Sequence, residues 1–285
     1  MRSASGRAFS SIFLASFLFG LMAFLVKVLS ASLPAAEILF IRATMGIVFI
    51  MSLVVFGFTK FRVNNRNMLF VRGLFGGTAI FLYFTSIGRL PLSTVALIAN
   101  SYPLFAIMFS MIMIKENPSY DSVFALMAAF IGLFLVLNPQ FGTLDIGYFF
   151  ALVAAIFGGV AITAVRELRK TDTSFVIIFA QMVGASAICF IPTANNFRAP
   201  SLTDWGMLLL ITAVSIVGQF YLTRPFKYVK ASEGSIIALA TSVFAIAFAV
   251  LFLDEVLTYQ FIAGALLVFG SSIYLIAREE GRVKI

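Results

Sequence analysis

Residues 92–116 read LSTVALIANSYPLFAIMFSMIMIKE, and residues 231–255 read ASEGSIIALATSVFAIAFAVLFLDE. A shift of 139 positions carries the first stretch onto the second and aligns Phe105-Ala106-Ile107 with Phe244-Ala245-Ile246. Each stretch is an apolar run long enough to cross a bilayer, which takes about 20 residues, and each closes on an acidic residue, Glu116 or Glu255. A recurring apolar segment with the same ending indicates an internal repeat in a membrane protein.

The composition of the whole chain supports a lipid environment. Of its 285 residues, 61% are hydrophobic and only 11% are charged, and the mean hydropathy is +1.06. A soluble chain of this length would carry a polar coat around its cores, and this coat is missing. The net charge of +8 does not indicate nucleic-acid binding, because the basic residues lie in short loops between apolar runs, as the positive-inside rule requires.

The residue types present exclude most enzymatic chemistry. The chain has no histidine and a single cysteine, Cys189, so histidine bases, histidine metal ligands and an internal disulfide are absent. It has no P-loop, HExxH or CxxC motif. We therefore expect no enzyme, no cofactor and no metal site.

Hydropathy predicts an all-α protein with ten transmembrane helices and no soluble domain. The expected spans are 9–29, 36–58, 68–87, 92–114, 120–138, 144–165, 173–192, 205–223, 232–253 and 258–277. With a cytoplasmic N-terminus, sixteen Lys and Arg residues, Arg72 among them, fall at inner span ends. Only Lys27, Arg89 and Arg198 fall at outer ends. This bias predicts a multi-pass protein of the cytoplasmic (inner) membrane with both termini cytoplasmic.

The repeat divides the ten spans into five and five. Residues 1–140 form the first predicted unit and residues 141–285 the second, which is inverted because five is odd. Inverted repeats with a midplane site at their interface recur among transporters. At an offset of 138, which aligns Phe19-Gly20 with Phe157-Gly158, Arg42 falls on Ala180. The second unit would then have no counterpart of Arg42.

The sequence resembles the EamA-type branch of the drug/metabolite transporter superfamily. The residues that carry the resemblance are RGLFGGTAIFLYFTSIGRLPLSTVALIANSYPLFAIMFSMIMIKE (72–116) and the weaker partner segment that ends in FLDE (252–255). The resemblance covers the whole chain and implies two inverted repeats around a cavity formed by spans 1, 3, 4, 6, 8 and 9. It does not name the substrate, because the family carries many unrelated solutes.

Arg42 lies inside an apolar span, AEILFIRATMGIVFIMSLVVFGF (36–58). Arginine stays charged in proteins, so its charge needs a partner or a solute. One interpretation is structural, with Arg42 bound to carbonyls or to a neighbouring helix. The other is that Arg42 and Lys27 attract the carboxylate or phosphate of an anionic or zwitterionic solute. Glu37, in a first helical turn, is expected to act as a cap or in proton coupling.

Polar and aromatic residues within other spans complete the predicted substrate site. Asn100 precedes Pro103, which removes a helical hydrogen bond and leaves backbone to line a cavity. The other candidates are Tyr83, Tyr102, Gln219, Tyr221, Thr241 and Ser242. Interhelical hydrogen bonding is the structural alternative for the polar ones, and packing for the aromatic ones.

These observations predict a secondary transporter that moves a small polar or amphipathic metabolite by alternating access, in the direction of export. Uptake or exchange is the alternative within transport, and a non-transporting scaffold or receptor is the alternative from another class. The predicted partners are a small-molecule substrate and the lipid bilayer. Coupling to protons or to a counter-substrate, and a monomeric or homodimeric state, stay open.

Overall fold

The computed structural model describes residues 2–115 and 145–282, together with positions 120, 124, 127, 128, 131, 132 and 135. The regular elements of this part of the chain are helices. In the first half they are α1 (Arg2–Leu29), α2 (Ala35–Val55), α3 (Arg66–Arg89), α4 (Leu92–Ala99) and α5 (Tyr102–Ile114). In the second half they are α7 (Ile146–Leu168), α8 (Ser174–Asn195), α9 (Leu202–Thr223), the 3₁₀ turn η1 (Arg224–Lys227), α10 (Ala231–Ala238), α11 (Ala240–Phe252) and α12 (Tyr259–Arg282).

The helices fall where hydropathy predicts them. Within the described residues, seven helical segments are long and apolar enough to cross a membrane, with α4 and α5 together forming one of them, Leu92–Ile114. Two shorter apolar helices, Ala240–Phe252 and Tyr259–Ser271, occupy the positions of the expected ninth and tenth spans. The expected fifth span, 120–138, and Glu116 lie outside the described residues, apart from the single positions named above.

The two halves repeat one another at an offset of 139. α4 and α10 match residue for residue under this shift, and α2 and α8 begin 139 positions apart. Lys115 and Asp254, which are also 139 positions apart, both adopt a left-handed backbone with φ of 54°. An L-residue rarely adopts that conformation, so its recurrence at equivalent positions is a strong sign of one backbone plan used twice.

Close helix crossings settle the register of the repeat. A Cβ added to Gly20 of α1 would lie 2.6 Å from Phe244 Cβ of α11, and one added to Gly159 of α7 would lie 2.6 Å from Phe105 Cβ of α5. The shift of 139 relates these crossings, whereas the shift of 138 at Phe19-Gly20 does not. That alignment of the first helix was wrong by one residue, because Gly20 can be matched with either member of the Gly158-Gly159 pair.

Polar links define the two ends of the bundle. At the Asp172 end, the Asp172 carboxylate accepts hydrogen bonds from the backbone N–H groups of Asn64 (2.9 Å) and Asn65 (3.2 Å), so it joins the loop after α2 to the loop after α7. At the Glu255 end, the Glu255 carboxylate accepts from the N–H groups of Leu92 (2.6 Å) and Ser93 (3.0 Å) at the start of α4.

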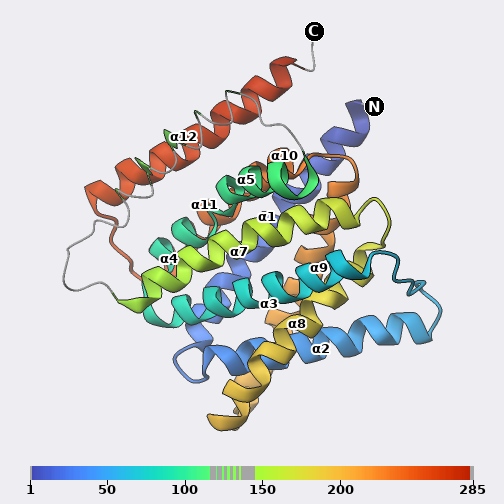
Figure 1. The fold of residues 1–285 in the computed structure, drawn as a ribbon. Coiled ribbons are helices and arrows are strands. Elements are labelled where there is room, and N and C mark those ends of the chain that lie inside the picture. The colour runs from blue at the N-terminus through green and yellow to red at the C-terminus, as the bar shows by residue number, and fades with distance from the viewer. Residues whose placement is uncertain are drawn as a thin grey trace.

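The second half is inverted relative to the first. α4 starts at the Glu255 end, whereas the residues just before α10, Phe226 and Val229, pack with Leu168 and Val176 near the Asp172 end. The halves also interlock, because α1 packs against α9 and α11 of the second half while α7 packs against α3 and α5 of the first. Figure 1 shows α12 along one edge of the bundle and α2 and α8 along the opposite edge.

The crossing of α3 and α8 predicts a large effect of a single methyl group. A Cβ added to Gly184 would lie 2.0 Å from Gly73 O and 2.8 Å from Gly73 Cα, so Gly184→Ala has to separate the two helices. We expect a loss of about 1–3 kcal/mol of stability from this overpacking. Thermal unfolding of the detergent-purified protein measures it, with Gly206→Ala as control, since no atom lies within 4 Å of a Cβ there. Equal melting temperatures for the two variants would contradict the crossing.

Candidate functional site

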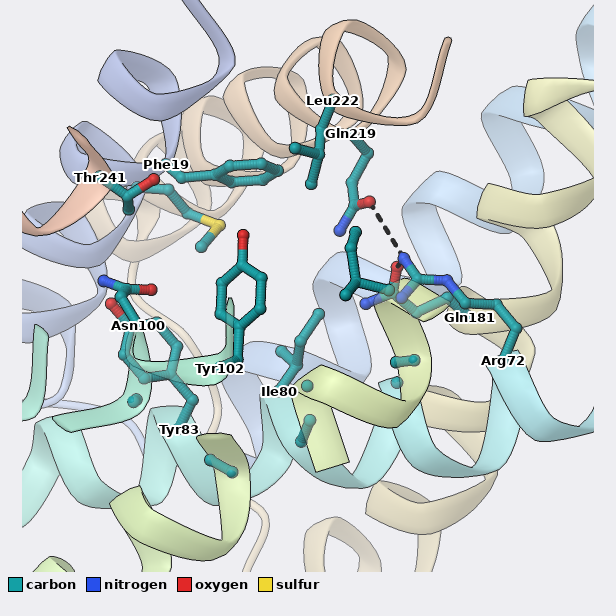
Figure 2. Close-up of a pocket in the computed structure, with 18 of the residues that line it drawn as sticks. Phe19, Arg72, Ile80, Tyr83, Asn100, Tyr102, Gln181, Gln219, Leu222 and Thr241 are labelled. Carbon is teal, nitrogen blue, oxygen red and sulfur yellow. Dashed lines mark hydrogen bonds between the residues drawn. The ribbon is translucent and has the colours of Figure 1, made fainter. Parts of the chain in front are cut away.

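A cavity of about 140 Å³ lies where the two halves meet. Its walls come from α1, α2, α3, the α4–α5 break, α7, α8, α9 and α11 (Figure 2). The lining residues are Phe19, Met22, Arg42, Arg72, Gly76, Ala79, Ile80, Tyr83, Ala99, Asn100, Tyr102, Ala154, Gly158, Ala161, Ile162, Gln181, Gln219, Leu222 and Thr241. The walls are therefore mostly apolar, with a few polar groups, as is usual for small-molecule sites.

The break in the fourth span supplies one wall. α4 ends at Ala99, α5 begins at Tyr102, and Pro103 is the second residue of α5. Proline fits there because the first turn of a helix has no internal partner for its N–H. Asn100, with φ −79° and ψ 4°, turns its side chain into the cavity (Figure 2). The ninth span breaks at the equivalent position, Leu239, although it has no proline.

Arg72 marks the part of the cavity nearer the Asp172 end, which we call the Arg72 pole. Its Nη2 donates hydrogen bonds to Gln181 Oε1 and to Gln219 Oε1, the latter at 3.3 Å, and Figure 2 shows the three side chains together. Arginine side chains near a helix start commonly reach back towards water. Arg72 instead extends inwards and lies against Gly76, one turn further into the bundle. A Cβ added to Gly76 would lie only 3.1 Å from Arg72 Nη1.

Arg42 marks the part of the cavity nearer the Glu255 end, which we call the Arg42 pole. It is the eighth residue of α2, so its Cα lies roughly 10 Å from the start of that helix at 1.5 Å per residue. The guanidinium carbon lies 5.8 Å from the centre of the Phe84 ring in α3, within the range of a cation–π contact. Tyr83 and Asn100 lie side by side in the cavity wall (Figure 2).

Tyr102 stands between the two poles. Figure 2 shows its ring rising between Asn100 on one side and Gln219 on the other. The ring has this room because residue 158 is glycine, where an added Cβ would lie 3.1 Å from Tyr102 Cβ. The Tyr102 ring thus lies across the middle of the cavity, on the same side as Phe19 and Leu222 (Figure 2).

Several lining side chains leave buried nitrogen or hydroxyl groups without a partner among the described residues. These groups are Arg42 Nε and Nη1, Arg72 Nε, Asn100 Nδ2 and the Tyr83 hydroxyl. Unpaired buried polar groups are rare in folded proteins and call for an explanation. All of these groups can donate a hydrogen bond, so a ligand that supplies acceptors would satisfy them.

Six of the nine residues that the sequence singles out for the substrate site line the cavity: Arg42, Tyr83, Asn100, Tyr102, Gln219 and Thr241. Lys27, Tyr221 and Ser242 lie outside the lining that the described residues form. Their assignment to the site stays a prediction, and their contacts in the structure are of another kind.

Of the three residues outside the lining, Lys27 and Ser242 bind backbone carbonyls of other helices and Tyr221 is partly exposed. Lys27 Nζ donates to Ile87 O (2.9 Å) and Leu90 O (2.8 Å), where it satisfies carbonyls at the end of α3. Ser242 Oγ donates to Ala96 O at 2.9 Å and so ties α11 to α4. Tyr221 is 37% exposed, because two positions along a helix turn a side chain about 200° away from the lining residue Gln219.

The predicted substrate site leaves out Arg72 and Gln181, which also line the cavity. Arg72 counts as an inner span end by charge, yet it is buried in the cavity. The sequence signal that could have identified Arg72 is that it opens the segment 72–116, which carries the family resemblance. The offset of 139 also replaces Ala180 by Gln181 as the counterpart of Arg42. Both members of this pair line the cavity, as do Tyr102 and its counterpart Thr241.

Comparison with known proteins places this architecture in a family. The model of the EamA-like transporter family matches the chain twice, at residues 7–138 and 145–277. The chain belongs to this family. It is therefore a multi-pass membrane protein of the drug/metabolite transporter superfamily. The two matches also agree with the repeat that relates α2 to α8 and α4 to α10.

Relatives of this EamA-like chain are named as transporters, and two of the names give different solutes. It is 31% identical over 270 residues to the pseudopaline exporter CntI of Pseudomonas aeruginosa, covering 94% of this chain and 95% of that one. It is 27% identical to mouse solute carrier family 35 member G1, covering 91% and 75% of the two chains. It is 22% identical to an S-adenosylmethionine uptake transporter of Rickettsia bellii, covering 89% and 88%. A crystal structure that is 18% identical has the same fold, with a TM-score of 0.68 over 95% of this chain and 97% of that one.

Proposed function

We propose that this EamA-like protein is a secondary transporter that exports a small polar or amphipathic metabolite across the cytoplasmic membrane by alternating access. The metabolite is amino acid-like, zwitterionic or anionic. The observation that carries the proposal is the central cavity, which places Arg42 and Arg72 in an apolar enclosure between two inverted halves. Transporters of this design bind their solute near the midplane and open to each side in turn.

The paired ends of the bundle support alternating access. The Glu255 end holds α11 and α4 together through the Glu255 carboxylate, which also accepts from Ser93 Oγ at 2.6 Å. Such a link is local to one end, so it can form and break without disturbing Asn64 and Asp172 at the other. Glu37 also lies at the Glu255 end, where it accepts from Arg198 N at 3.0 Å, and it does not belong to the described cavity lining.

A flux measurement tests the proposal directly. Purified protein in liposomes should move at least one member of a panel of radiolabelled amino acids, carboxylic acids and zwitterionic metabolites, whereas protein-free liposomes should not. A scaffold or receptor would move none, and that result would sink the transport proposal.

Direction separates export from the alternative of uptake or exchange. Export is favoured because the relative that is 31% identical is named an exporter, although a more distant relative is named an uptake transporter. Cells that lack the protein should accumulate the solute if it exports, and should fail to take up external solute if it imports.

The charge asymmetry of the two ends predicts the orientation. Loop residues at the Asp172 end include Lys60, Arg62, Arg169 and Lys170, so we expect this end and both termini to be cytoplasmic. In a Cys189→Ala background, a cysteine at position 62 or 169 should react with a membrane-impermeant thiol reagent only after the cells are opened. A cysteine at Arg198, at the Glu255 end, is the matched control and should react in intact cells. Labelling of position 62 or 169 in intact cells would show that the protein has the opposite orientation.

A further inference from the structure

The cavity holds two positive charges and no opposing carboxylate among the described lining residues. Arginine does not lose its proton in proteins, so both guanidiniums stay charged. A buried charge without a counterion is strongly destabilising. The two arginines therefore indicate that the cavity binds a negatively charged ligand.

Arg89, outside the cavity, is paired with a carboxylate, whereas the cavity arginines have no carboxylate partner among the described residues. At the Glu255 end, the exposed Arg89 forms a two-point ion pair with Asp145, with Nε to Oδ1 at 2.8 Å and Nη2 to Oδ2 at 3.1 Å. Arg72 instead receives two amide oxygens, from Gln181 and Gln219. Amides orient the guanidinium without neutralising it, and they leave Arg72 Nε unpaired among the described residues.

The distance between the two guanidiniums can be estimated along α3, because each of them lies beside a residue of that helix. The guanidinium of Arg72 lies beside Gly76, and that of Arg42 lies over the ring of Phe84. Gly76 and Phe84 are eight residues apart, which corresponds to roughly 12 Å along the helix axis. At that separation the two arginines are too far apart to grip a single carboxylate, whose charge-assisted hydrogen bonds are only about 2.7–2.9 Å long.

We propose that the transported solute carries two acid groups, one bound at the Arg42 pole and one at the Arg72 pole. This inference rests on the proposed transport function and narrows its substrate class. With a charge-assisted hydrogen bond from a guanidinium at each end, the two acid groups are separated by roughly 5–9 Å. Tyr102, Phe19 and Leu222 line the middle of the cavity, so the middle of the solute is apolar or aromatic.

Unpaired donors in the cavity wall fit this assignment. Asn100 Nδ2 and the Tyr83 hydroxyl lie beside each other in the cavity wall and have no other hydrogen-bond partner among the described residues. Tyr83 precedes Phe84 and so lies at the level of Arg42 along α3, where an acid group could accept from both. At the Arg72 pole, Nε remains available while Nη2 is held by the glutamines. A solute with one acid group would leave one pole unsatisfied, which is the physical basis for discrimination against it.

Binding to the full-length protein in detergent tests the proposal. The probes are straight-chain α,ω-dicarboxylates of about four to ten carbons and monocarboxylates of matched length, measured by titration calorimetry and by thermal shift. We expect the best dicarboxylate to bind at least about tenfold more tightly than its matched monocarboxylate, because the second contact forms within the same complex. The preference should peak at an intermediate length.

Substitutions at Arg42 and Arg72 test whether each arginine binds one of the two acid groups. Arg42→Gln and Arg72→Gln should each remove the dicarboxylate preference while they change monocarboxylate affinity by no more than about threefold. Arg89→Gln loses an arginine outside the cavity and should bind like the unmodified protein. If an arginine variant does not fold, Gln181→Glu keeps both arginines, gives Arg72 an internal carboxylate, and should remove the preference in the same way.

The outcomes separate this inference from the proposed function. Equal binding of dicarboxylates and monocarboxylates by the unmodified protein would overturn the two-acid assignment. So would an arginine variant that loses both kinds of probe equally, because the two charges would then act on one acid group. In either case the liposome flux measurement still tests the transport function independently, because a transporter of solutes with one acid group would also move solute.

Discussion

Arg42→Gln protein is expected to reach the membrane in normal amounts and to transport at less than about one tenth of the unmodified rate. A hydrogen bond to a charged group contributes about 1.5–3 kcal/mol, which corresponds to about a tenfold to hundredfold loss when it is removed. The fold should tolerate the change, because the equivalent position in the second half, Gln181, already carries glutamine in the same cavity.

Arg42→Lys separates charge from geometry. Lysine keeps the positive charge but lacks the planar fork that grips a carboxylate at two points. We expect transport to persist with the apparent affinity weakened by about five- to tenfold. Initial rates at several solute concentrations in liposomes measure this. Normal transport by both variants, or a loss of stability in detergent by both, would assign Arg42 to structure alone, with its contact to Phe84 as its role.

The second large effect is expected at the broken fourth helix. Asn100→Leu replaces an unpaired cavity amide by an apolar side chain of similar size, next to Tyr83 (Figure 2). We expect the variant to retain under about one tenth of the transport rate, because an acid group at the Arg42 pole would lose a donor and face a hydrocarbon wall.

The repeat also supplies the control for this variant. Leu239 stands at the position equivalent to Asn100, in the break between α10 and α11, and is buried. A leucine is therefore compatible with this backbone, and Asn100→Leu protein should show the melting temperature of the unmodified protein. Well-expressed Asn100→Leu protein that transports normally would show that Asn100 serves packing.

The sequence by itself determined the parts of the fold that depend on local properties. Runs of apolar residues predict spans because a helix in lipid must satisfy its backbone internally and match the bilayer thickness. α2 (Ala35–Val55), for example, lies within three residues of the predicted 36–58. The break in the fourth span was also predictable, because proline forbids a hydrogen bond wherever the rest of the chain lies. The absence of histidine excluded histidine chemistry without any structure.

The tertiary structure alone decided which of the candidate polar and charged side chains share the cavity. Lys27 and Arg72 both look like span-end cations in the sequence, yet Lys27 binds the carbonyls of Ile87 and Leu90 whereas Arg72 turns inwards to Gln181 and Gln219. The difference depends on how each helix is rotated about its axis and on how closely a partner approaches it. At Arg72 that approach is possible because Gly76 leaves room for the guanidinium. Rotation and approach are set by packing between helices that are distant in the sequence, so no local pattern along the chain specifies them.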